Sequence, residues 1–186
     1  SNPRTAAPAA VGGDLTVASF NVLNYFTTLG NANPSCVAYL DRAGNGVTVR
    51  QGCDQRGAWG AADLQRQQDK IVAAINVLDA DVVGLMEIEN SAALGEQADE
   101  ATATLVGALN AAAGSERWAF IPSSTELPAV SQQDVITNAI IYQVDAATPV
   151  GAARALGTMS ADNQAFGNAR EPIAQVFKPA AGGAPL

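Results

Sequence analysis

One short segment constrains the fold of this chain more than any other. Residues 82–86 (Val-Val-Gly-Leu-Met) form an uninterrupted apolar run, which is typical of a strand buried on both faces of a sheet. From Asp63 onward, the preceding segment has apolar residues spaced by threes, fours and sevens, which predicts an amphipathic helix. A helix followed at once by a buried strand favours an α/β fold. The apolar positions of the predicted helix are Leu64, Ile71, Ile75 and Leu78.

Patterns elsewhere add further strands and a second helix. Residues 15–22 alternate β-forming and small side chains and predict an opening strand. Residues 96–113 predict a helix that Gly114 ends, with one side suited to packing. That side comprises Ala98, Ala101, Leu105 and Leu109, and three more strands are expected at residues 117–121, 135–142 and 172–177.

Composition indicates one globular domain. Of the 186 residues, 48% are hydrophobic and 15% are charged, which suits a buried core better than disorder. Residues 1–14 are small, with proline and glycine, and are interpreted as a linker or trimmed N-terminus. Residues 15–179 then form the folded unit, and residues 180–186 form a tail. No apolar run reaches the roughly 18 residues that suggest a membrane span.

Charge and residue usage exclude several classes of site. The chain carries 10 Lys and Arg against 18 Asp and Glu, a net charge of −8, so it cannot bind nucleic acid through a broad basic surface. Phosphate affinity must then come from bound cations. An acidic pocket that concentrates divalent metal and a plain acidic surface explain this charge equally well. The sequence has no histidine, which excludes Ser-His-Asp triads and His-ligated zinc within the chain.

The two cysteines lie in a stretch without clear periodicity. Cys36 and Cys53 bracket a polar, glycine-containing part of residues 23–55, which is expected to be a long loop. Two thiols without a nearby histidine fall short of the four ligands of structural zinc, so a disulfide is the better interpretation. Closing such a loop would stabilise the fold by roughly 3 kcal/mol in the chain-entropy model. A disulfide persists in oxidising compartments, which favours a secreted, extracellular protein.

Three polar side chains stand out as candidates for phosphate chemistry. Glu87 ends the apolar run, where its charge is costly unless water or a cation receives it. Alternatively, the strand ends at Met86, and Glu87 and Glu89 are solvated loop residues. Asn21 interrupts a β-forming run and needs partners for its amide, which a strand-end cap would also provide. Arg170 could offer its fork of donors to a phosphate, or it could be an ordinary surface or ion-paired arginine.

Four blocks of sequence, in this order, resemble the deoxyribonuclease-I-like endonuclease/exonuclease/phosphatase superfamily. The similarity is greatest to secreted bacterial endonucleases of the ExeM/NucH type, and it covers most of the chain from Leu15 to Phe177. The blocks are SFNVLNYF from Ser19, the Cys-bracketed loop with RGA and RQQDKIVAAI up to Ile75, LDADVVGLMEIEN from Leu78, and finally DVITNAIIY with AREPIAQVF.

The resemblance implies roles for the candidate residues. It implies that Glu87 is the principal ligand of a divalent metal and that Asn21 lies beside the metal and the scissile phosphate. Arg170 would contact backbone phosphate, while Glu89 and Asn90 would be weaker neighbours. The implied metal is Mg²⁺, with Mn²⁺ or Ca²⁺ as alternatives, because carboxylate and carbonyl oxygens suit these cations.

The same resemblance implies a larger fold than this chain provides. The family fold is a four-layer α/β sandwich of two sheets, and the chain corresponds to its N-terminal portion. We therefore expect a mixed sheet with helices on one face and the second half missing. The apolar face left open predicts a homodimer, strand exchange, pairing with the missing half or marginal stability. The family's catalytic histidine, Asp-x-Asn pair and Asp-His pair are not in this sequence, so little activity is expected from the chain alone.

The expected function is hydrolysis of phosphodiesters in DNA or RNA by a metal-dependent, extracellular endonuclease. A lipid or small phosphoester is the alternative substrate within the same superfamily. A non-catalytic α/β binding module is the alternative from another class, because the chain lacks the other catalytic groups.

Overall fold

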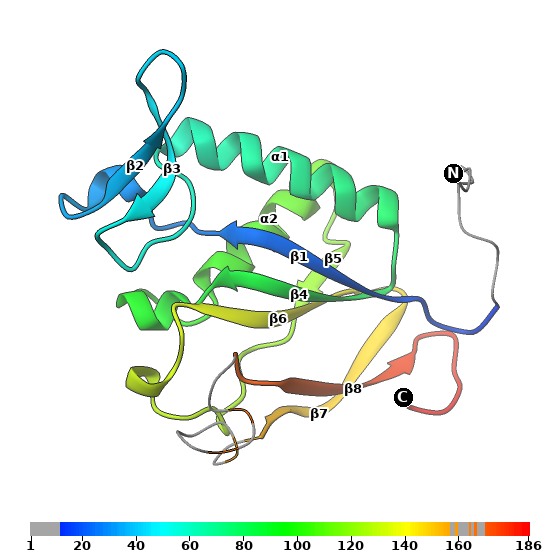
Figure 1. Ribbon diagram of the computed structural model, residues 1–186. Helices are drawn as coiled ribbons and strands as arrows, with labels where there is room; N and C mark the ends of the chain where they lie inside the picture. Colours follow the sequence, from blue (N-terminus) through cyan, green and yellow to red (C-terminus); the bar gives the residue numbers. More distant parts are fainter. Residues whose placement is uncertain (1–11, 157–158, 160–163, 165, 167–169) are drawn as a thin grey trace, which may run out of the picture.

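The computed structural model describes residues 12–156, 159, 164, 166 and 170–186 (Figure 1). It confirms a mixed α/β architecture built on a mixed sheet. Strand β1 runs parallel to β4, and β6 runs antiparallel to both β4 and β5, in the order β1-β4-β6-β5. Most of the predicted linker, residues 1–11, lies outside the described residues. The four strands are β1 (Val17–Tyr25), β4 (Val82–Glu89), β5 (Trp118–Phe120) and β6 (Ile136–Gln143).

Two helices cover one face of this sheet (Figure 1). Helix α1 (Ala61–Leu78) and helix α2 (Glu100–Ala113) share one apolar core with β1, β4 and β6. Full burial of one large apolar side chain stabilises a fold by about 1.5–3 kcal/mol, so this core is the main source of stability. No helix in the described ranges is both long and apolar enough to cross a membrane. The fully buried core residues include Ile75, Leu85, Ile88, Leu105, Leu109 and Ile141.

The helix predictions hold with two corrections at the ends. Leu78 is 43% exposed because α1 ends there, in a left-handed Asp79. Ala98 lies outside α2 and is exposed, because Gly95 and Asp99 adopt positive φ and a short 3₁₀ turn, η2 (Ser91–Leu94), precedes the helix. The remaining residues of the predicted packed side, Ala101, Leu105 and Leu109, are completely buried.

An antiparallel ribbon lies on the sheet face opposite the helices (Figure 1). It consists of β7 (Ala147–Ala155) and β8 (Ile173–Pro179), joined to the sheet through a second small apolar cluster. The rings of Tyr142 and Phe177 are 5.4 Å apart within that cluster. The second face of the sheet is therefore not bare. This corrects the expectation from the sequence that the face would be left open. Strand β7 was not predicted, because Pro149, Gly151 and several alanines give it no alternating pattern.

The stretch expected to be a long loop contains a small hairpin. Strand β1 continues to Tyr25, a 3₁₀ turn follows at η1 (Gly30–Ala32), and β2 (Val37–Leu40) then pairs with β3 (Gly46–Gln51). The predicted disulfide between Cys36 and Cys53 is confirmed and joins the two ends of the hairpin. A covalent link between its two ends can stabilise a hairpin that would be only marginally stable by itself.

Removing the disulfide should destabilise the whole chain. For Cys36→Ser combined with Cys53→Ser, we expect the free energy of unfolding to fall by about 3 kcal/mol, because the cross-link spans 17 positions and limits the unfolded chain. Urea titration followed by tryptophan fluorescence measures this change. An unchanged unfolding midpoint would show that the hairpin is held by its other contacts alone.

Candidate metal and phosphate site

A bulge in β4 positions Glu87. Leu85 and Ile88 both belong to the core beneath the helices, although two residues separate them instead of one. The pairing of β4 with β6 shifts between the same two residues, and Glu87 has a φ of 62°. Such a backbone is uncommon for a residue other than glycine, and bulges often redirect a side chain beside a functional site. Glu87 is thereby turned away from the helix-side core.

Asn21 lies on the neighbouring strand at the same level. It pairs with Met86 across β1 and β4, and the register of β1 shifts between Asn21 and Tyr25. Its neighbour Val22 is buried in the helix-side core, whereas Asn21 is exposed toward the opposite face. The side-chain Oδ1 of Asn21 accepts a hydrogen bond from the N–H of Leu23 at 2.7 Å. Asn21 therefore makes a local bond at an irregular point within β1 and not at a strand end, and its oxygen keeps a second lone pair.

Arg170 approaches Glu87 from the segment before β8. Its Nη2 lies 3.6 Å from a carboxylate oxygen of Glu87, and the two side chains are 38% and 26% exposed. A pair so loose and partly exposed contributes at most about 1 kcal/mol of stability. The contact therefore contributes little to stability, but it shows that a positive and a negative side chain lie side by side here.

Asn138 completes this group and was not singled out from the sequence. It lies on β6 between Thr137 and Ala139, whose partners Ile88 and Leu85 flank the bulge. Its Nδ2 donates to the backbone carbonyl of Glu171 at 3.1 Å, which fixes the segment that carries Arg170. The signal was available: Asn138 is an amide within a β-forming run, like Asn21. Applied to both strands, that argument would have identified it.

Glu89 has a different environment from Glu87. Strand β4 continues to Glu89, which is only 2% exposed, so the alternative of two solvated loop glutamates is wrong. The Glu89 carboxylate accepts from the hydroxyls of Thr27, Thr28 and Ser91 and from the N–H of Thr28. These bonds occupy its oxygens and anchor the chain after β1. Glu89 therefore acts as a structural carboxylate.

Asn90 and Tyr25, like Glu89, make contacts that hold the structure around the candidate site. The Nδ2 of Asn90 donates to the side chain of Gln133 at 2.8 Å and to the carbonyl of Asp134 at 2.9 Å, which holds the entry to β6. Tyr25 is fully buried and donates its hydroxyl to Gln68 at 2.6 Å. Burial, followed by the nearby charge of Glu89, raises the pKa of Tyr25 well above its ordinary value.

Two polar atoms near Glu87 remain without hydrogen-bond partners in the described part of the chain. They are Nε of Arg170 and Oε2 of Glu171, and both are buried. Glu171 as a whole is 3% exposed. Buried polar atoms without partners are rare in folded proteins and costly. The polar network around Glu87 is therefore incomplete within these residues.

The donor set fits a hard cation that keeps several waters. Among the described residues, no three His, Cys, Asp or Glu side chains gather as a metal cage. Mg²⁺ is commonly held by only one or two carboxylates with water and does not need such a cage. Glu87 offers one carboxylate and Asn21 one amide oxygen, from adjacent strands.

Comparison with known proteins does not add to this geometry. Neither a scan against protein-family models nor a search of curated proteins found a match for the chain. The roles that the family resemblance implies for Asn21, Glu87 and Arg170 therefore stay predictions.

The two glutamates should respond oppositely to substitution. Glu87→Gly should leave the free energy of unfolding unchanged or raise it by up to about 1 kcal/mol, because glycine accepts a positive φ without strain. Glu89→Gln should lower it by about 2 kcal/mol, because an amide cannot accept the same four bonds. Chemical denaturation of both variants tests this difference. A large loss of stability in the Glu87 variant would give that residue a structural role instead.

Tyr25 should make the fold sensitive to alkali. Because the folded pKa is raised above the unfolded value near 10, its contribution is complete below about pH 10 and is lost as pH rises further. We expect the urea midpoint to fall as the pH rises above about 10, and to fall less in Tyr25→Phe. Identical slopes for the two proteins would contradict this assignment.

Proposed function

We propose that this chain forms the metal- and phosphate-binding part of a phosphodiesterase site that acts on nucleic acid. The observation that carries the proposal is the bulge of β4. It turns Glu87 out of the helix-side core, one position after Met86, the partner of Asn21 on β1, and Glu87 lies 3.6 Å from Arg170. A non-glycine residue with positive φ costs energy, and such strain clusters at functional sites. Glu87, one of five such residues in the described part of the chain, is also the candidate ligand.

The charges around Glu87 suit a metal and a phosphate bound together. A carboxylate attracts a divalent cation, while a guanidinium beside it offers parallel donors to phosphate oxygens. Arg170 and Glu87 are close enough to share one ligand and too loosely paired to neutralise each other strongly. A cation on Glu87 would compete with Arg170 for the carboxylate and leave the guanidinium available to phosphate.

Each residue has a defined part in this proposal. Glu87 and Asn21 would hold Mg²⁺, or Mn²⁺ or Ca²⁺ in its place, and the ion would supply stabilisation of charge on the phosphoryl oxygens. Arg170 would orient the phosphate, and Asn138 would keep the Arg170 segment in position through the Glu171 carbonyl. The chain has no histidine to act as a general base, so we expect weak hydrolysis by these residues alone.

The setting of the protein is part of the proposal. The Cys36–Cys53 disulfide supports an oxidising, extracellular environment. Pairing with a second copy, or with further sequence that covers the ribbon face, stays a prediction.

Metal binding tests the proposal directly. We expect Glu87→Gln to weaken binding of Mn²⁺, the paramagnetic probe, by about tenfold or more, because a neutral amide replaces the only carboxylate ligand. Asn21→Ala should weaken it less, because water can replace an amide oxygen. Electron paramagnetic resonance titration measures free Mn²⁺, and added Mg²⁺ should displace the bound ion.

A matched control removes one charge elsewhere. Glu116 is exposed in the turn before β5, at the sheet edge opposite β1. Glu116→Gln lowers the negative charge equally but should leave Mn²⁺ affinity unchanged. If Glu87→Gln and Glu116→Gln bind Mn²⁺ equally well, the metal site is not at Glu87.

A further inference from the structure

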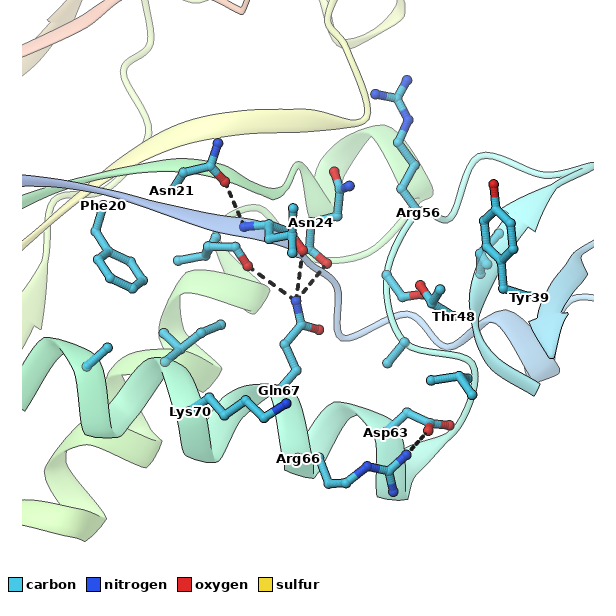
Figure 2. Close-up of a pocket in the computed structure, with 18 residues that line it drawn as sticks. Phe20, Asn21, Asn24, Tyr39, Thr48, Arg56, Asp63, Arg66, Gln67 and Lys70 are labelled. Atoms are coloured by element: carbon cyan, nitrogen blue, oxygen red, sulfur yellow. Dashed lines mark hydrogen bonds and ion pairs between the residues drawn. The ribbon is translucent and has the colours of Figure 1, made fainter. Parts of the chain in front are cut away.

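A second site lies beside the end of β1. A cleft of about 710 Å³ is bounded by the last residues of β1, helix α1 and the β2–β3 hairpin (Figure 2). Apolar side chains make up most of its surface, including Val22, Val49, Ile71 and Ala74. Its volume lies within the range of pockets that hold small organic ligands. Asn21 also lines it, so the cleft adjoins the proposed metal site.

Cations concentrate around this cleft although the chain is acidic. Arg56, Arg66 and Lys70 line it, three of the ten Lys and Arg residues in the sequence. Arg56 is paired with Asp134 at 3.0 Å and Arg66 with Asp63, so Lys70 carries the argument. The one acidic side chain among the lining residues is Asp63, whose carboxylate already accepts from the N–H of Gly60 and from Arg66. Lys70 has no carboxylate within ion-pair distance in the described ranges. The cleft therefore favours an anionic group near Lys70.

The wall formed by β1 is held in place before any ligand arrives. The Nε2 of Gln67 lies 3.2, 2.9 and 3.3 Å from the carbonyl oxygens of Val22, Leu23 and Asn24. Figure 2 shows these three contacts, with Lys70 extending from α1 toward Gln67. Leu23 and Asn24 both have positive φ, and the Gln67 contacts compensate for that irregular backbone. A preformed wall lowers the entropy that binding must overcome.

An aromatic ring stands at the hairpin side of the cleft. Tyr39 on β2 is 55% exposed, and the guanidinium of Arg50 lies 5.7 Å from its ring centre. That contact restrains one face of the ring. A large exposed aromatic beside apolar and cationic side chains is the combination that proteins use to hold unpaired bases and their phosphates.

We propose that this cleft binds an unpaired nucleotide of a single-stranded nucleic acid segment. The base lies against the apolar floor and Tyr39, and the adjoining phosphate lies near Lys70. This inference rests on the proposed function, which it extends by naming the form of the substrate. The strand would cross the edge of the sheet at Asn21, with one phosphate at Glu87 and Arg170 and a neighbouring nucleotide in the cleft. A base within a duplex would not fit, because both of its faces are already stacked on neighbouring base pairs.

Binding without metal tests this site separately from catalysis. In the presence of a chelator, fluorescence anisotropy would follow a short labelled oligodeoxythymidine binding to the purified chain. We expect Lys70→Glu to weaken this binding by about tenfold, because a phosphate contact becomes a repulsion. The control is Lys178→Glu on β8, an equal charge change on an exposed strand far from the cleft, which should change affinity by less than about twofold. Equal losses in the two variants would overturn the proposal.

A second experiment tests whether the cleft binds the base as well as the phosphate. An oligomer of the same length with abasic sites should bind about tenfold more weakly than oligodeoxythymidine, because it lacks the stacking group. Ala74→Trp, which fills the cleft from α1, should remove that difference. Equal binding of the abasic oligomer to the native chain would show that only phosphate is held, and the nucleotide site would be wrong.

The two proposals fail in different ways. Glu87→Gln should not weaken oligonucleotide binding in chelator, because without metal the Glu87 carboxylate only repels phosphate, while Lys70→Glu should leave Mn²⁺ binding unchanged. If Mn²⁺ binding depends on Glu87 but no oligonucleotide binding depends on Lys70, the cleft proposal falls alone. If the reverse holds, the metal site falls and the cleft stands.

Discussion

The burial of both Leu85 and Ile88 beneath the helices is the constraint from which the candidate site follows. Alternate residues of a regular strand face one side, so two apolar anchors three positions apart cannot both face the core without an extra residue between them. Burying each side chain is worth about 1.5–3 kcal/mol, more than the roughly 1–2 kcal/mol that a left-handed residue costs. The core therefore enforces the bulge, and the bulge turns Glu87 outward.

The parts of the fold that follow from local periodicity could be predicted from the sequence. Helix α1 and the buried strand β4 have strong patterns, and their packing agrees with those patterns. Strand β7 and the β2–β3 hairpin could not be predicted, because Pro149, glycines and scattered polar residues leave no period to recognise. Their formation depends on distant partners: Phe177 and Tyr142 for the ribbon, and a cross-link for the hairpin.

The candidate site was only partly visible in the sequence for a related reason. Glu87 was noticed because a charge ends an apolar run, but the same argument could not separate it from Glu89. The separation depends mainly on Thr27 and Thr28, which the chain brings to Glu89 from the segment after β1, while Ser91 follows Glu89 by only two positions. Nor does any local pattern predict that Arg170 contacts β4, since that contact joins residues separated by about half of the folded unit.

The contact of Gln67 with the end of β1 couples that strand to α1. A primary amide carries two hydrogens, yet three carbonyl oxygens lie within hydrogen-bonding distance of its nitrogen. The three acceptors therefore share two hydrogens of a single side chain. Because Asn21 immediately precedes those carbonyls, the position of α1 bears directly on the position of the proposed metal ligand. One helix side chain thus does for the end of β1 what a neighbouring strand does in an ordinary ladder of backbone bonds.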